Sequence, residues 1–224
     1  MNKNIFVACD LSSQKEILEL LPKIHDKISG IKIGLQYITQ SSPKEIKELS
    51  KFNKPIFYDG KFFDIKNTLV ESVKSLKSLN ISYATVHLLN GLNALKAANE
   101  AAKDINVKLL GVSVLTSFDD DELEYLGFRD KVEKQVLRLI KIADEANLHG
   151  VICSPLEIKS IKKFAPNLKC FTPGIRQDGN KNDQKRTMNA KQALNAGSDC
   201  LIIGRPITKG DPKKNIQEIL SSLI

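Results

Sequence analysis

The feature that most constrains the fold is a regular alternation of two kinds of segment along the whole chain. Short β-branched or apolar runs alternate with amphipathic stretches of helical period, a pattern typical of repeated βα units and a parallel sheet. Eight strands are expected, at 5–10, 31–35, 55–62, 83–88, 109–116, 150–155, 170–175 and 200–205. Helices are expected near 13–28, 43–52, 67–79, 92–103, 131–147, 156–164, 189–196 and 212–223. Eight units in 224 residues predict one domain over 1–224, a closed (β/α)8 TIM barrel.

The main alternative is an open, doubly wound sheet. Such a sheet, when it binds a dinucleotide, normally carries a Gly-rich GxGxxG turn after an early strand. The sequence contains no such turn. The barrel is therefore the favoured architecture.

The composition narrows the classes of function. The apolar run at the N-terminus reaches Asp10 quickly, and no stretch approaches the ~18 apolar residues of a membrane span, so a soluble, cytoplasmic protein is expected. The four cysteines lie apart in strand-like runs without CxxC spacing, and are interpreted as reduced core residues. Asp, Glu and His show no ligand spacing. No structural metal is expected.

The net charge of +8 raises the alternative of a catalytically silent nucleic-acid-binding protein. Most of this charge is lysine mixed with Glu and Asp along helical stretches, which is typical of a solvated helix face. Three of the five arginines, Arg176, Arg186 and Arg205, fall in the last quarter of the chain, close to glycines. Arginine is suited to bidentate phosphate binding, so these three residues are more informative than the lysines.

Charged residues gather at the predicted strand ends, where barrels carry their active sites. Asp10 ends the first strand, Lys32 lies in the second, and the third carries Asp59 and Lys61, with Asp64 just beyond. Residues two apart on a strand point to the same side, so the side chains of Asp59 and Lys61 are expected on the same side of the third strand. Asp10 and Lys32 extend them into a row of alternating charge that keeps each lysine protonated. A structural ion-pair network fits these residues as well.

The run YDGKFFDIKNT at 58–68 resembles the signature of the orotidine 5′-monophosphate decarboxylase family, an Asp-x-Lys-x-x-Asp core followed by Ile-x-Asn-Thr. Where the family commonly has Leu, His and Pro, this chain has Gly60, Phe63 and Lys66, none of which is a charged catalytic position. Further matching segments follow in the family's order: ACD (8–10), KIG (32–34), VSVLTS (112–117), TPGIR (172–176), DQKR (183–186) and IIGRP (202–206).

The resemblance implies a cofactor-free carboxy-lyase that makes uridine 5′-monophosphate in pyrimidine synthesis. Asp10 would contact the ribose, and Lys32 would bridge the ribose and the catalytic network. Asp59, Lys61 and Asp64 would complete the charged array, with Lys61 stabilising a C6 carbanion and protonating it.

The resemblance also implies a homodimer with shared active sites. Asp64 and Thr68 would reach into the site of the other subunit. Thr116 would contact the pyrimidine, and the phosphate would be held by Arg176, Gln184, Gly204 and Arg205. The polar segment 176–186 is interpreted as a lid over the ligand.

The nearest rival function is a decarboxylase or aldolase acting on keto-sugar phosphates on the same barrel, usually with magnesium. Ile65, Asn67 and Thr68, together with the region of Thr116, favour the pyrimidine enzyme. His87 and Ser154 also lie at strand ends and are assigned no role.

Overall fold

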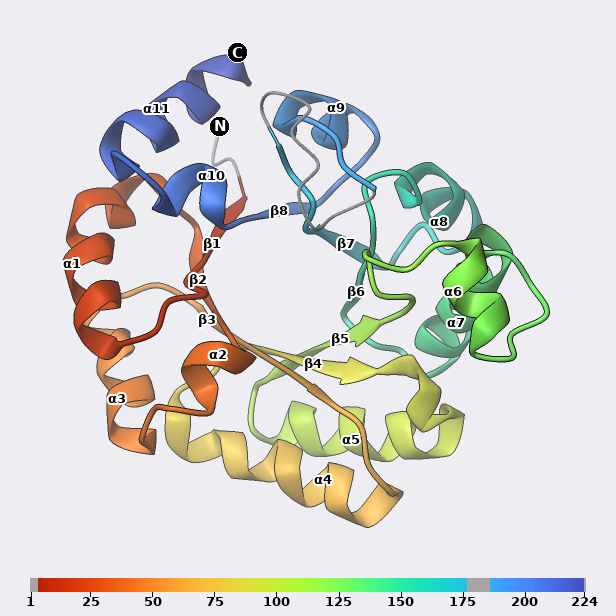
Figure 1. Cartoon of the computed structure of the whole chain (residues 1–224). Helices are drawn as coiled ribbons and strands as arrows, with labels where there is room; N and C mark the ends of the chain where they lie inside the picture. Colours follow the sequence, from red (N-terminus) through yellow and green to blue (C-terminus); the bar gives the residue numbers. More distant parts are fainter. Residues whose placement is uncertain (1–3, 177–185, 224) are drawn as a thin grey trace.

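The computed structural model describes residues 4–176 and 186–223. Its eight strands are all parallel to their neighbours and form a closed barrel in chain order, so the barrel prediction is confirmed (Figure 1). The strands are β1 (Ile5–Ala8), β2 (Gly30–Gly34), β3 (Ile56–Phe62), β4 (Tyr83–His87), β5 (Lys108–Val112), β6 (Gly150–Ile152), β7 (Lys169–Thr172) and β8 (Cys200–Ile203).

Helices surround the barrel because each presents an apolar face to the strands. The expected helices are α1 (Gln14–Ile24), α3 (Pro43–Glu48), α4 (Lys66–Ser75), α5 (Leu92–Asp104), α7 (Val132–Glu145), α8 (Ile158–Phe164), α9 (Ala190–Asn195) and α11 (Pro212–Ser222). Short 3-10 turns follow three of these helices and strand β4: η1 (His25–Lys27), η2 (Leu49–Phe52), η3 (Leu76–Leu79) and η4 (Leu88–Asn90).

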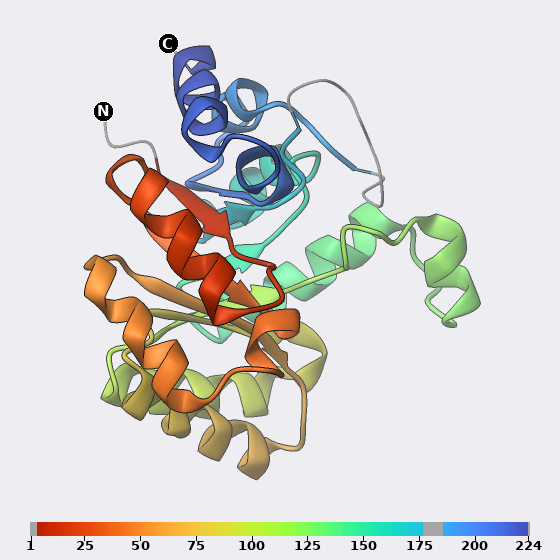
Figure 2. The same ribbon diagram turned by 60° about the vertical axis from the view of Figure 1, so that its left-hand side comes forward.

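Three short helices were not predicted: α2 (Leu35–Ile38), α6 (Asp120–Tyr125) and α10 (Arg205–Thr208). Each lies in a segment that follows a strand. Helix α6 begins after Asp119, whose side chain accepts a hydrogen bond from the backbone N–H of Glu122. Figure 2 shows this green segment standing away from the barrel. Its six residues are too few to give a helical period in the sequence.

Several strands end earlier than the sequence predicted. Runs expected to reach 116, 155 and 175 leave the barrel after Val112, Ile152 and Thr172. After β7 the chain turns at Pro173, which lacks an N–H, and at Gly174, which has a φ of 81°. Asp10, Thr116 and Arg205, which were expected within strands, therefore lie in the segments just beyond them.

The barrel interior is filled at one end by aromatic rings. Phe6, Phe57, Tyr83 and Phe171 contact one another at centroid distances of 5.4 to 6.4 Å, mostly edge to face. Phe6, Phe57 and Tyr83 lie in the first halves of their strands, and Phe171 of β7 contacts all three, so the apolar plug occupies the N-terminal end of the barrel. The carboxyl ends of the strands remain available for a cavity.

Within residues 4–176 and 186–223, no helix combines the length and apolar character needed to cross a membrane.

Candidate active site

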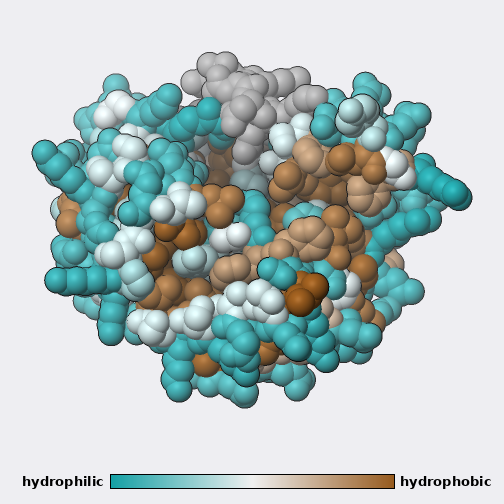
Figure 3. All heavy atoms as spheres, turned by 60° about the horizontal axis from the view of Figure 1, so that its bottom comes forward, coloured by the Kyte–Doolittle hydropathy of each residue, from teal (hydrophilic) through white to brown (hydrophobic). Residues whose placement is uncertain are grey.

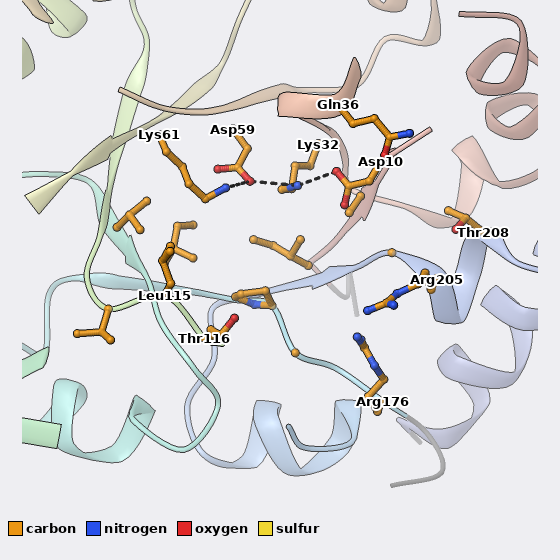
Figure 4. Close-up of a pocket in the computed structure, with 18 residues that line it drawn as sticks. Asp10, Lys32, Gln36, Asp59, Lys61, Leu115, Thr116, Arg176, Arg205 and Thr208 are labelled. Atoms are coloured by element: carbon orange, nitrogen blue, oxygen red, sulfur yellow. Dashed lines mark hydrogen bonds and ion pairs between the residues drawn. The ribbon is translucent and has the colours of Figure 1, made fainter. Parts of the chain in front are cut away.

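A cavity of about 450 Å³ opens at the carboxyl ends of the strands. Figure 4 shows three groups of side chains around it: a charged row, a pair of arginines and an apolar wall. Its lining residues are Ala8, Asp10, Lys32, Gln36, Asp59, Lys61, Val112, Val114, Leu115, Thr116, Ile152, Pro173, Gly174, Arg176, Ile202, Gly204, Arg205 and Thr208.

The charged row runs Lys61, Asp59, Lys32, Asp10 across strands β3 and β2 and the segment that follows β1 (Figure 4). Oδ2 of Asp59 lies 2.9 Å from Nζ of Lys61 and 3.1 Å from Nζ of Lys32. Nζ of Lys32 also donates to Oδ1 of Asp10 at 3.2 Å. The inner pair is buried, with side-chain exposures of 10% for Lys32 and 9% for Asp59.

The inner pair keeps its charges. Burial by itself raises the pKa of Asp59, but Lys32 and Lys61 outweigh it and leave the pKa below the ordinary value. Burial lowers the pKa of Lys32, but Asp59 and Asp10 outweigh it and leave that pKa raised. A lysine ammonium and a carboxylate are therefore both ionised in the cavity at neutral pH.

Lys61 reaches this row through an irregularity in β3, not through the period-two geometry that the sequence suggested. The register between β3 and β4 shifts between Tyr58, opposite Ala84, and Phe62, opposite Val86. Such a shift marks a β-bulge, and Lys61 within it has a φ of 47°, in the left-handed region. The two side chains meet as expected, but the turn of the backbone at Lys61 brings them together.

The structure shows what surrounds two of the positions that depart from the family pattern, Gly60 and Phe63. A Cβ at Gly60 would lie 2.6 Å from the Tyr58 ring, which stacks on Phe62 with 5.6 Å between centroids. These rings fill the space beside Gly60. The ring of Phe63 is 63% exposed and lies 5.5 Å from the His87 ring.

Gly34 is a site residue that sequence reasoning did not assign. A Cβ at this position would lie 2.4 Å from Oδ1 of Asp10 and 3.3 Å from Nζ of Lys32. The absence of a side chain at position 34 thus leaves room for the Asp10–Lys32 contact. The segment KIG (32–34) contains this glycine, but the sequence does not show that position 34 lies next to Asp10 in the folded chain.

Arg176 and Arg205 lie on another side of the cavity from Lys61, and their guanidinium groups point toward the same space (Figure 4). Arg205 is the first residue of α10, directly after Gly204, and Arg176 follows β7. Gln184 lies outside the described residues, as does the predicted lid apart from Arg176 and Arg186. Gln36 and Thr208 also line the cavity; they follow β2 and β8, but an uncharged polar residue after a strand is a weak signal.

Thr116 lines the cavity with an apolar wall that includes Val112, Val114 and Ile202. An apolar wall beside a few polar groups is usual for a small-molecule site. Asp64 and Thr68 do not line the cavity of their own chain; both are exposed. Asp64 accepts a hydrogen bond from the backbone N–H of Ile65, and its own N–H donates to Oδ1 of Asn90.

The described residues contain no group of three or more His, Cys, Asp or Glu side chains arranged to hold a metal ion. His87 lies at the end of β4, where its Nδ1 accepts from the backbone N–H of Leu89. Ser154 is fully buried, and its backbone N–H donates to Glu157.

The closed barrel and the charged cavity at the carboxyl ends of its strands define a TIM-barrel enzyme. Residues 3–219 match the model of the orotidine 5′-phosphate decarboxylase / HUMPS family, and the chain belongs to this family.

Named relatives span nearly the whole chain. An orotidine 5′-phosphate decarboxylase of Wolbachia sp. subsp. Brugia malayi is 38% identical and covers 96% of both chains. That of Legionella pneumophila strain Lens is 38% identical over 100% of this chain and 99% of its own. The crystal structure of orotidine 5′-phosphate decarboxylase from Lactobacillus acidophilus, 32% identical, superposes with a TM-score of 0.85 and covers 99% of both chains.

Proposed function

We propose that this chain decarboxylates orotidine 5′-monophosphate to uridine 5′-monophosphate and CO2, the last step of de novo UMP synthesis. The observation that carries the proposal is the row Lys61–Asp59–Lys32–Asp10, which places an ammonium group against a buried carboxylate in the cavity. The curated relatives bear the name of this activity. In this proposal the enzyme works in the cytoplasm, and its substrate is a small nucleotide and not a nucleic acid.

The chemical step needs a cation beside the reacting carbon. When the C6–carboxylate bond breaks, CO2 leaves and the electron pair stays on C6 as a carbanion with little delocalisation. The Lys61 ammonium stabilises this charge and then donates a proton to C6, which leaves a neutral amine that regains its proton from solvent. Asp59 lies next to Lys61, where repulsion of the substrate carboxylate favours its departure. The scheme uses no cofactor or metal ion.

The remaining residues bind and orient the nucleotide. Arg176 and Arg205, with the Gly204 backbone and Gln184, hold the phosphate, for which guanidinium groups are well suited. Asp10 and Lys32 contact the ribose, and Thr116 contacts the pyrimidine against the apolar wall. Binding energy from the phosphate, remote from C6, then contributes to orientation and to the rate.

The active enzyme in this proposal is a homodimer, with Asp64 and Thr68 completing the site of the partner. Asp64 is exposed between Phe63 and Ile65, whose exposures are 63% and 74%. Exposed apolar residues that form a contiguous patch are typical of interaction surfaces. Figure 3 shows brown apolar patches around a hollow on one face of the molecule.

The test is an assay of the purified chain with orotidine 5′-monophosphate in the presence of a metal chelator. The loss of the orotate absorbance, with uridine 5′-monophosphate and CO2 as products, is the expected result. Turnover of keto-sugar phosphates with added magnesium, and none of the nucleotide, would support the rival function instead. Salt-sensitive binding of nucleic acid without any turnover would favour a binding protein.

A further inference from the structure

The hydroxyl of Thr85 makes hydrogen bonds with two residues of the charged row, Lys61 and Asp59, from outside the cavity. Thr85 lies in β4, is completely buried and is not among the cavity-lining residues. Its Oγ1 accepts a hydrogen bond from the backbone N–H of Lys61 at 2.8 Å and donates one to Oδ1 of Asp59 at 2.9 Å. The ionised carboxylate of Asp59 can only accept, so the single hydroxyl proton of Thr85 points to Asp59 and a lone pair receives the Lys61 N–H.

The contact with Lys61 compensates for the bulge. Between the paired positions Tyr58–Ala84 and Phe62–Val86, strand β3 has three residues where β4 has only Thr85. The backbone N–H of Lys61 meets the Thr85 side chain in this gap. A non-glycine residue in the left-handed region is strained and persists where the surroundings hold it. The Thr85 hydroxyl holds Lys61 in that conformation.

The contact with Asp59 orients its carboxylate. Oδ1 faces Thr85, while Oδ2 faces both Nζ of Lys61 and Nζ of Lys32. A rotation of the carboxylate would break the Thr85 bond and weaken the contacts with both lysines. Each oxygen of Asp59 therefore has a defined partner, and the direction of the Lys61 ammonium depends on this arrangement.

We infer that Thr85 is a positioning residue for the proposed decarboxylation: one hydroxyl fixes the backbone of Lys61 and the carboxylate of Asp59 without touching the substrate. The inference rests on the proposed function. It concerns the geometry of the proton donor and not the affinity for the nucleotide. The loss of the hydroxyl accordingly lowers kcat more than it changes KM.

The test compares Thr85→Val, which removes the hydroxyl and keeps the shape, with Thr85→Ser, which keeps the hydroxyl. Thr172→Val is the matched control: Thr172 is equally buried, and its Oγ1 accepts from Ser198 Oγ at 2.8 Å, away from the charged row. The measurements are kcat and KM for orotidine 5′-monophosphate, the affinity for uridine 5′-monophosphate and the midpoint of thermal unfolding.

For Thr85→Val, kcat should fall about tenfold to a hundredfold, the range expected when a reacting group is misplaced by a fraction of an ångström to one ångström. KM and product affinity should change less than about threefold, and Thr85→Ser should keep most of kcat. Thr172→Val should lower the unfolding midpoint but not kcat. If Thr85→Val does not fold, Thr85→Ala removes the same hydroxyl and carries the same expectation.

The inference is overturned if the Val or Ala variant keeps wild-type kcat, if Thr85→Ser loses as much as Thr85→Val, or if Thr172→Val loses as much kcat. Wild-type protein in the same assay separates the two proposals. A wild type without turnover refutes the proposed function and, with it, this role of Thr85. A wild type with normal turnover leaves the comparison of variants decisive for Thr85 alone.

Discussion

Lys61 combines a left-handed backbone with an ammonium group in contact with a nearly buried carboxylate. Its side chain is 33% exposed, whereas Asp59 beside it is 9% exposed, so the cation faces the cavity and the anion lies behind it. Lys32 contacts Asp59 from the other side. The Asp59 carboxylate thus retains a cationic partner when Lys61 is changed.

We predict that Lys61→Ala lowers kcat by several orders of magnitude while the protein stays folded, because the ammonium acts mainly in the transition state. The check is kcat with orotidine 5′-monophosphate alongside the thermal unfolding midpoint. Lys77→Ala, at an exposed lysine of η3, is the control and should behave as wild type. Activity of Lys61→Ala within about tenfold of wild type would remove Lys61 as the proton donor.

Gly34→Ala should lower kcat/KM about tenfold with little change in the unfolding midpoint. The backbone φ of −103° suits alanine, but the new Cβ would push the Asp10 carboxylate away from Lys32. A double-mutant cycle with Asp10→Ala checks this route, since the glycine change should add little once the carboxylate is gone. Additive losses would show that the effect does not pass through Asp10.

The pH dependence of stability reports the charge on Asp59. Its pKa is below the ordinary 3.8, so its stabilising contribution is complete above that value and is lost as the pH falls through the lower folded pKa. The difference in free energy of unfolding between wild type and Asp59→Asn should stay constant from about pH 5 to about pH 7 and narrow below about pH 4. Urea denaturation measures it; a change near neutrality would mean that Asp59 titrates there.

The elements that carry the site are short and follow the strands. Helices α2 and α10 each begin directly after a strand, and they bring Gln36, Arg205 and Thr208 to the cavity. Helix α10 has four residues, and Pro206 within its first turn is compatible with a helix start. Segments this short depend on the barrel for their conformation, because isolated helices of a few residues are unstable.

Arg205→Ala should raise KM for orotidine 5′-monophosphate about tenfold to a hundredfold, the value of a hydrogen bond to a charged group. It should matter far less for orotidine, which lacks the phosphate. Lys209→Ala, at the exposed residue just after α10, serves as a control for a nearby lost cation. Equal losses with orotidine and its monophosphate would contradict the phosphate role of Arg205.

The two ends of the barrel differ in what fills them. Aromatic rings fill the N-terminal end, and the charged cavity opens at the other. Asp64, three residues after Lys61, remains outside the cavity on an exposed, partly apolar segment. A second subunit that covers this segment would exclude water from it and could receive Asp64 in its own site.

Mixing two inactive variants tests the shared site. In a heterodimer of Lys61→Ala and Asp64→Ala, one site has both defects, whereas the other has both wild-type residues. Random exchange makes half of the dimers hetero, each with one intact site of two, so activity should recover to about one quarter of wild type. The assay follows subunit exchange between labelled variants, with the unmixed variants as controls. Verified exchange without recovery would mean that each site takes Lys61 and Asp64 from the same chain.

The sequence by itself predicted the barrel, since strand and helix periods are local and parallel βα units follow one another in chain order. It also predicted the meeting of Asp10, Lys32, Asp59 and Lys61, because the carboxyl ends of parallel strands share one end of the barrel. Strand limits were less accurate: a β-branched run does not reveal where the ladder stops, as the end of β5 at Val112 illustrates.

The tertiary structure alone decided the bulge in β3, the left-handed conformation of Lys61 and the space that Gly34 leaves for the Asp10 carboxylate. Thr85 is the clearest case: it belongs to a strand that reads as ordinary core, and its hydrogen-bond partners lie 24 and 26 residues away in the sequence. A buried hydroxyl acquires a role from the groups packed around it, and no local pattern encodes which groups those are.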